Sequence, residues 1–427
     1  MLIQPKVAPD QSVKALGPLV MYCVNLSYPY SSNGYAVRTH GVAKGLVANG
    51  YDVIVVNRPG RPWDLPDTGE YNNTELDLCV DGIRYLFLPY PSRRFVNKQL
   101  NWQQEAVNSL YQLMQVFKPD IILGASNWEN AELSCQAAKR AAIPFYYEVR
   151  GFWELSRASR DPAYSQSTQF SYEHSKEAEV ANNATHVFTL NLAMAAELTQ
   201  RGVDATKISV VPNCCIDIPA VPESEHVKRP FTIGYIGSFS EYEGLDDLVQ
   251  ACAMLKTQVG EIRLMLVGSS QREGLSSGEG TIERRLKTLA EKVNLTKEFE
   301  LYDRVPGTEI ASFYHNIDVV VNPRRSFLVT ELVSALKPVE AASYGKVVLL
   351  SSVKPNLELA EQCKIFHLFE EGSIESLVAQ LNKIYTTDGV LQQAKLIGPA
   401  WVKKNRLFKH AVQVMIDKFN SRLSTLC

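Results

Sequence analysis

Short apolar runs alternate with segments of helical period along most of this chain, and this alternation restricts the fold more than any other feature. Apolar runs bounded by turn residues are typical of buried strands, and strands that alternate with helices form βαβ units with parallel sheets. We therefore predict an α/β protein. The expected strands lie near residues 18–25, 52–57, 83–89, 119–124, 144–149, 186–190 and 207–211, and then near 231–236, 262–267, 298–302, 317–322 and 346–350.

The strands fall into two series with a proline-rich segment between them. Residues 211–230 contain four prolines without periodicity, which is typical of a linker. At 427 residues the chain is also too long for one hydrophobic core. We predict two Rossmann-like, doubly wound domains, residues 1–218 and 219–400, that face each other across a cleft at the carboxyl ends of their strands. The expected helices lie near residues 35–48, 102–117, 129–141, 171–183, 192–201, 243–257, 281–292, 308–315, 335–344, 372–384 and 400–420.

The composition is that of a globular protein without a strong overall charge. Hydrophobic residues make up 45% and charged residues 21%, and the formal net charge is −2, so no general attraction to nucleic acid is expected. The eight cysteines lack zinc-type spacing and the seven histidines are dispersed, which predicts free thiols and no metal site. No stretch approaches the roughly 18 apolar residues of a membrane span, and no export signal is recognised. We expect a cytoplasmic protein without a metal or other cofactor.

Two loops between a strand and the following helix are candidate phosphate sites. Asn33 and Gly34 lie in such a loop in the first series, and Gly237 and Ser238 lie in the corresponding loop of the second. Free N–H groups at a helix start suit a phosphate, and a glycine at a strand end allows a diphosphate to approach the backbone. An ordinary strand-to-helix turn explains the first loop equally well.

Arg150 follows a predicted strand and precedes a glycine. A guanidinium at the carboxyl edge of a sheet can clamp a phosphate or polarise a leaving group. The alternative is an ion pair of Arg150 with Glu148 or Glu154 at the surface.

A cluster of charges near the C-terminal third carries the strongest signal. Arg324 and Arg325 follow a predicted strand, Lys337 stands at a predicted helix start, and Glu340 lies in the first turn of that helix. The cations suit phosphate groups, and the oxygens of Glu340 can accept two hydrogen bonds from a ribose diol. The cluster therefore predicts a pocket for an anionic, hydroxyl-rich ligand such as a nucleotide-sugar, although each charge alone could simply face solvent.

Together these motifs resemble those of retaining glycosyltransferases with the GT-B fold, specifically glycosyltransferase family 4 of bacterial surface-polysaccharide pathways. The resemblance covers nearly the whole chain. It is carried by Asn33-Gly34, Glu148-Val149-Arg150-Gly151-Phe152-Trp153-Glu154, Val211-Pro212-Asn213 with Asp217, Gly234-Tyr235-Ile236-Gly237-Ser238-Phe239, Leu266-Val267-Gly268 and Lys337-Pro338-Val339-Glu340-Ala341.

The resemblance implies roles for several of these residues. Glu340 matches the second glutamate of the family's Glu-x7-Glu element, which holds the donor ribose, and Gly34 and Gly237 match glycines that pack against the diphosphate. Arg150 stands where many members have a cleft histidine. The resemblance also implies that a C-terminal helix, about residues 401–427, crosses back to complete the first domain.

The chain departs from the family pattern at three positions. Leu332 replaces the first glutamate of the Glu-x7-Glu element, and the nearest carboxylate, Glu331, is one position away. Ser238 and Glu243 stand where many members have the arginine and lysine that bind the diphosphate. We expect cations elsewhere in the sequence, namely Arg150, Arg324, Arg325 and Lys337, to supply the missing charge.

The function implied by the resemblance is transfer of a sugar from a nucleoside-diphosphate sugar, on family grounds a UDP-sugar, to a hydroxyl of a glycan or glycolipid acceptor. The expected catalytic residues are Arg150, Lys337 and Glu331. The expected donor-binding residues are Asn33, Gly34, Gly237, Ser238, Arg324, Arg325 and Glu340.

Two alternatives to a glycosyltransferase stay open at this point. One is a nucleotide-sugar epimerase on the same scaffold, and the other is a protein that binds a nucleotide-sugar without catalysis. Peripheral contact with the cytoplasmic face of the inner membrane, through Arg93, Arg94 and Lys98, is also left open. The sugar, the acceptor and the oligomeric state are not predicted.

Overall fold

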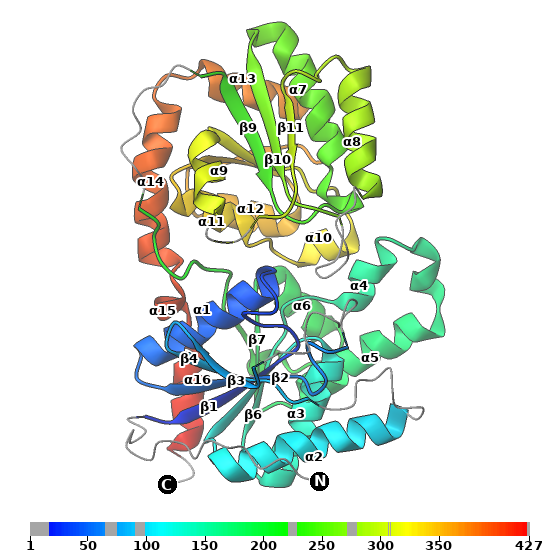
Figure 1. Cartoon of the computed structure of the whole chain (residues 1–427), viewed down its shortest axis with the longest axis vertical. Coiled ribbons are helices and arrows are strands. Elements are labelled where there is room, and N and C mark those ends of the chain that lie inside the picture. Colours follow the sequence, from blue (N-terminus) through cyan, green and yellow to red (C-terminus); the bar gives the residue numbers. More distant parts are fainter. Residues whose placement is uncertain are drawn as a thin grey trace.

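The protein has two α/β lobes stacked along its long axis, each built around a twisted sheet with helices packed on it (Figure 1). The structure is a computed structural model that describes residues 17–64, 75–89, 99–220, 229–270, 280–305, 307 and 309–424. The prediction of an α/β fold with two doubly wound sheets is confirmed.

The first lobe contains an eight-stranded sheet of order β3-β4-β2-β1-β5-β6-β7-β8. All neighbouring strands are parallel except β3 and β4, which form an antiparallel hairpin at one edge. The strands are β1 (Leu19–Val24), β2 (Asp52–Asn57), β3 (Asp77–Val80), β4 (Ile83–Leu86), β5 (Ile121–Ala125), β6 (Phe145–Glu148), β7 (His186–Thr189) and β8 (Ile208–Val210). Its helices are α1 (Gly34–Ala48), α2 (Gln99–Phe117), α3 (Trp128–Ala141), α4 (Trp153–Ala158), α5 (Thr168–Asn183) and α6 (Leu192–Gln200).

The second lobe contains a six-stranded, fully parallel sheet of order β11-β10-β9-β12-β13-β14. The strands are β9 (Phe231–Ile236), β10 (Ile262–Val267), β11 (Phe299–Tyr302), β12 (Val319–Asn322), β13 (Val347–Ser351) and β14 (Phe366–Phe369). The helices that follow in sequence are α7 (Leu245–Val259), α8 (Thr281–Lys292), α9 (Ile310–Asn316), α10 (Leu328–Leu332), α11 (Lys337–Ser343), α12 (Lys354–Ala360), α13 (Ile374–Thr386), α14 (Val390–Asn405), α15 (Phe408–Ala411) and α16 (Gln413–Leu423).

Every predicted strand has a counterpart in the structure. Apart from residues 390–399 of α14, the elements that the sequence pattern missed are short. The missed strands, β3 and β14, each have four residues and lie at sheet edges, where one face or both stay partly exposed and the apolar signal is weak. Helices α4, α10 and α12 have five to seven residues, too few for a helical period to stand out.

The prediction of a single helix over residues 400–420 is wrong, because this segment forms the end of α14, all of α15 and most of α16. The break falls at Arg406 and Leu407, where the extended chain pairs with the interlobe connection. The carbonyl of Arg406 accepts a hydrogen bond from the N–H of Cys215 at 2.8 Å, and the N–H of Phe408 donates to the carbonyl of Cys215 at 3.0 Å. These backbone bonds replace helical ones at this point.

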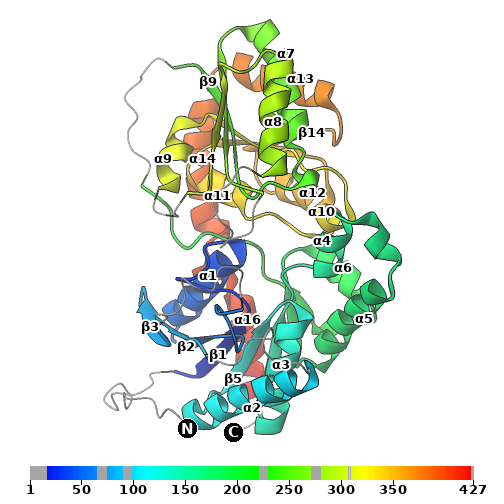
Figure 2. The same cartoon turned by 45° about the vertical axis from the view of Figure 1, so that its right-hand side comes forward.

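The last two helices pack against the first lobe, although α14 lies beside the second (Figure 1). Phe408, Met415 and Phe419 are buried with the residues of β1 and α1 in one apolar cluster. Gly41 of α1 makes this contact close, because a Cβ at that position would lie 2.2 Å from the ring of Phe408. The view turned by 45° shows the same crossing of the C-terminal segment between lobes (Figure 2).

No helix in the described part of the chain is both long and apolar enough to span a bilayer. Arg93, Arg94 and Lys98, the basic residues considered for membrane contact, lie outside the described residues.

Candidate active site

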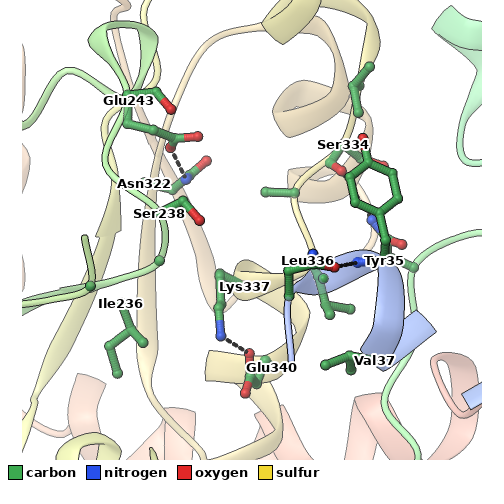
Figure 3. Close-up of a pocket in the computed structure, with 18 of the residues that line it drawn as sticks. Tyr35, Val37, Ile236, Ser238, Glu243, Asn322, Ser334, Leu336, Lys337 and Glu340 are labelled. Carbon is green, nitrogen blue, oxygen red and sulfur yellow. Dashed lines mark hydrogen bonds and ion pairs between the residues drawn. The ribbon is translucent and has the colours of Figure 1, made fainter. Parts of the chain in front are cut away.

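A cavity of about 440 Å³ lies between the lobes, at the carboxyl ends of strands from both sheets. Residues after β9, β10 and β12 line it from the second lobe, and the start of α1 and the segment after β6 line it from the first. Eight of the ten predicted site residues contribute to the lining: Asn33, Gly34, Arg150, Gly237, Ser238, Arg324, Lys337 and Glu340. Arg325 and Glu331 do not. Figure 3 shows Ser238 and Glu243 on one side of the pocket and Tyr35 on the other.

Asn33 is the N-cap of α1. Its Oδ1 accepts hydrogen bonds from the N–H groups of Tyr35 at 3.0 Å and Ala36 at 3.2 Å. The sequence pattern predicted free N–H groups at this helix start, but the cap occupies these two amides. A Cβ on Gly34 would meet no atom within 4 Å, so this glycine leaves open space beside the cavity.

Glu148, at the end of β6, lies between two arginines in the first-lobe wall. Its carboxylate accepts from Nε of Arg38 at 2.9 Å and from Nε of Arg150 at 2.7 Å. All three side chains are almost completely buried. Burial lowers the pKa of Arg150 to about 9. Burial also raises the pKa of Glu148, and the Arg38 guanidinium opposes that rise.

The structure does not support the prediction that Arg150 clamps a phosphate, because other groups of the protein occupy its donors. Its Nη1 donates to the carbonyl of Tyr35 at 3.1 Å and to Oγ1 of Thr39 at 2.9 Å, and its Nη2 contacts Tyr22 and Glu148. With Nε on Glu148, every donor of the guanidinium is used. Arg150 instead forms an ion pair with Glu148, which was the alternative prediction, but the pair is buried and not at the surface. Arg150 fixes the first turn of α1 beside the cavity.

Arg38 lines the cavity, although it is not among the predicted site residues. Its Nη1 donates to the carbonyl of Pro212 at 2.9 Å and to Oδ1 of Asn213 at 3.2 Å, and its Nη2 donates to the carbonyl of Val211 at 2.8 Å. Arg38 therefore ties α1 and Glu148 to the start of the interlobe connection. A lone arginine one turn into a helix gave no sequence signal for this role.

Backbone atoms come close together in the second-lobe wall. Position 268 requires glycine, because its φ is left-handed at +146° and a Cβ there would lie 1.8 Å from the carbonyl oxygen of Gly237. The hydroxyl of Tyr235 donates to the carbonyl of Ser238 at 2.8 Å and orients this loop. Gly237 and Ser238 thus lie where a ligand can reach the backbone.

Lys337 and Glu340 form an ion pair that borders the cavity. Nζ of Lys337 lies 2.8 Å from Oε2 of Glu340, and the side chains are 35% and 23% exposed. Figure 3 shows this pair below the contact between Glu243 and Asn322. An ammonium group and a carboxylate therefore line the cavity at neighbouring positions.

Two family models match consecutive parts of the chain. The model described as "Glycosyl transferase 4-like domain" matches residues 33–214, and the model described as "Glycosyl transferases group 1" matches residues 219–398. Together they leave out only residues 1–32, 215–218 and 399–427. The chain belongs to the GT-B glycosyltransferases. No curated protein matches the sequence.

Solved structures share the fold of this glycosyltransferase at low sequence identity. Sucrose-phosphate synthase from Thermosynechococcus elongatus is 17% identical with a TM-score of 0.71, and the match covers 95% of this chain and 99% of that one. Anabaena HepE, solved with UDP and glucose, is 15% identical with a TM-score of 0.70 and coverage of 95% and 100%. WaaG, a glycosyltransferase involved in lipopolysaccharide biosynthesis, is 14% identical with a TM-score of 0.63 and coverage of 92% and 98%.

Glu331 of the glycosyltransferase does not line the cavity. Its Oε1 accepts from the hydroxyl of Ser326 at 2.7 Å, and its Oε2 accepts from the N–H of Lys354 at 3.2 Å, at the start of α12. The expectation that Glu331 takes part in catalysis is not supported by this placement. We assign it a helix-capping contact.

The adjacent arginines Arg324 and Arg325 have different surroundings. Arg324 lines the cavity, and its guanidinium is paired with Glu243 at 3.0 Å. Arg325 is paired instead with Asp246 at 2.9 Å and Asp247 at 2.7 Å, at the start of α7. The prediction that Arg325 supplies charge to the pocket is therefore not supported by the structure, because Arg325 does not line the cavity and its partners lie outside it.

This difference predicts unequal effects of two alanine substitutions. Arg324→Ala should weaken UDP binding about tenfold or more, because a hydrogen bond to a charged group contributes roughly 1.5–3 kcal/mol. Arg325→Ala should leave the dissociation constant within about twofold. Titration calorimetry with UDP measures both, and equal losses in the two variants would contradict the assignment.

No group of three or more histidine, cysteine, aspartate or glutamate side chains is placed to hold a metal ion within the part of the chain that the structure describes. The prediction that sugar transfer needs no metal ion is not tested by this observation and stays a prediction.

Proposed function

We propose that the glycosyltransferase transfers a sugar from a UDP-sugar to a hydroxyl of a glycan or glycolipid acceptor in surface-polysaccharide biosynthesis, with the anomeric configuration retained. The observation that carries this proposal is the cavity between the lobes, which places the Lys337–Glu340 pair beside the glycine loop at Gly237. A nucleoside diphosphate needs a cation for its phosphates and an acceptor for its ribose hydroxyls. Anabaena HepE was solved with UDP and glucose, which supports a donor of this class.

On donor binding, Glu340 accepts hydrogen bonds from the ribose diol, and Lys337 leaves Glu340 for the diphosphate. The diphosphate gains negative charge as the glycosidic bond breaks, so an ammonium group beside it stabilises the transition state more than the bound donor. Arg324 lies at the same wall and adds to the positive field, although Glu243 offsets part of its charge.

The proposed mechanism retains configuration by attack on the face of the sugar from which the leaving group departs. The acceptor oxygen forms the new bond to the anomeric carbon while the bond to the diphosphate breaks, and a donor phosphate oxygen takes the acceptor proton. Closure of the lobes keeps water from competing with the acceptor. We also propose that no metal ion is required and that the enzyme acts at the cytoplasmic side of the inner membrane.

A thermal-shift panel of nucleoside diphosphates and their sugars tests the donor assignment. UDP and one UDP-sugar should raise the melting temperature most, since a ligand at 100 times its dissociation constant stabilises by about 2.7 kcal/mol. Stabilisation by a guanosine diphosphate alone would contradict the uridine assignment.

Product analysis then separates transfer from the alternatives. With donor and a glycan acceptor, anomeric proton couplings should show a product with the donor's configuration. An epimerised donor in the absence of acceptor would favour an epimerase, and inversion in the product would contradict retention.

A further inference from the structure

Three consecutive backbone carbonyls of the second lobe, at residues 332–334, each accept a hydrogen bond from a side chain. We call these three groups the carbonyl strip. The carbonyl of Leu332 accepts from Asn191 at 2.8 Å, and that of Ser334 accepts from Asn213 at 3.1 Å. The carbonyl between them, at Val333, accepts from Arg324 at 2.8 Å. The two outer donors come from the first lobe, and the central donor comes from the second.

Asn191 uses both ends of its amide. Its Oδ1 is the N-cap of α6 and accepts from the N–H of Met194 at 2.8 Å, while its Nδ2 reaches across to Leu332. The side chain is 3% exposed and does not line the cavity. The N–H of Met194 can only donate, so the oxygen must face α6 and the nitrogen must face the other lobe.

Asn213 repeats this arrangement from the interlobe connection. Its Oδ1 accepts from Nη1 of Arg38 at 3.2 Å, and its Nδ2 donates to Ser334. The guanidinium of Arg38 has no acceptor, so the orientation of this amide is fixed in the same sense. Each asparagine thus binds its own lobe through oxygen and the carbonyl strip through nitrogen.

The strip leads directly into the cavity. Val333, Ser334, Ala335 and Leu336 line it, and Lys337 follows. Because a trans peptide unit is planar, a carbonyl held in one direction fixes the following N–H in the opposite direction. The contact of Asn191 at Leu332 therefore sets the direction of the N–H of Val333, which donates to the carbonyl of Val329 where the chain enters the cavity wall. The contact of Asn213 at Ser334 sets the direction of the N–H of Ala335, and the contact of Arg324 at Val333 sets that of Ser334.

We propose that Asn191 and Asn213 are positioning residues of the first lobe that order the donor-binding segment of the second lobe when the lobes close. The donor site is then complete only in the closed arrangement, although Asn191 does not border it. This inference rests on the proposed function, since it concerns binding of the UDP portion of the donor.

Substitutions at Asn191 separate the cap from the interlobe bond. Asn191→Ser keeps a good N-cap and stays neutral but cannot reach Leu332 with an amide. Asn191→Asp keeps the acceptor for Met194 and places a carboxylate against the Leu332 carbonyl. In titrations with UDP, the dissociation constant should rise about threefold to tenfold for Asn191→Ser and about tenfold or more for Asn191→Asp.

Asn182→Asp is a control for the loss of the same kind of bond within one lobe. Nδ2 of Asn182 also donates to a backbone carbonyl, that of Gly202 at 3.2 Å, but both residues belong to the first lobe. This variant should bind UDP as the wild type does. A purely structural role for Asn191 would lower the melting temperature of its variants without changing their affinity for UDP.

Wild-type affinity for UDP in both folded Asn191 variants would overturn the inference. If Asn191→Ser fails to fold, Asn213→Ser makes the same test, because it loses the amide donor to Ser334 without adding a charge to the cavity that Asn213 lines. Absence of UDP binding by the wild type would instead overturn the proposed donor, and with it the inference. The two failures are therefore distinguishable.

Discussion

Replacing Lys337 with alanine is expected to lower the turnover number for sugar transfer by about a hundredfold or more, because removal of one electrostatic donor at a developing negative charge costs roughly 2.7–4 kcal/mol. The ammonium group borders the cavity and is the partner of Glu340 in the structure. Its loss removes positive charge at the proposed diphosphate position. It also leaves Glu340 without its counter-ion, which opposes an anionic donor.

Steady-state kinetics with saturating donor measure this effect. Lys403→Ala provides the control, because Lys403 is exposed on α14 and should be neutral. If Lys337→Ala has wild-type turnover and wild-type affinity for the donor, Lys337 has no part in stabilising the leaving group.

Replacing Glu148 with glutamine is expected to lower the free energy of unfolding by about 3 kcal/mol or more. Arg38 and Arg150 share this carboxylate in a buried position, and removal of one partner from a buried ion pair costs roughly 3–5 kcal/mol because it leaves an uncompensated charge. A glutamine keeps the shape of the side chain but supplies only one acceptor oxygen and no charge.

Urea unfolding followed by circular dichroism measures the loss, and the melting temperature of the first lobe should fall by on the order of 10 °C. Asp77→Asn is the matched control. It breaks an ion pair with Arg84 whose side chains are 47% and 37% exposed, and such pairs contribute roughly 0–1 kcal/mol. Equal stabilities of the two variants would contradict a structural role for the buried cluster.

The lobes and most strands could be predicted because their signal is local. Val20 to Val24 and Val319 to Val321 are buried runs in parallel sheets, and each is followed by a turn and a helical segment. The break at Arg406 could not be predicted in this way. It depends on pairing with Cys215, which is distant in the sequence.

The candidate site was predicted only in part, because some of its contacts join residues that are distant in the sequence. The sequence places Arg324, Lys337 and Glu340 near one sheet edge, and the structure brings them to one cavity. The sequence alone does not show which of the two adjacent arginines, Arg324 or Arg325, lines the cavity, because that depends on the aspartates of α7. Nor does it show that Arg150 is held by Glu148 together with Arg38, since that cluster joins residues from separate elements.

The most direct test of the account is a crystal structure of the protein with UDP. The account predicts that the diphosphate lies between the lobes, with an oxygen within about 3 Å of Nζ of Lys337 and the ribose hydroxyls on the carboxylate of Glu340. A nucleotide bound elsewhere, with its phosphorus atoms remote from Lys337, would contradict it.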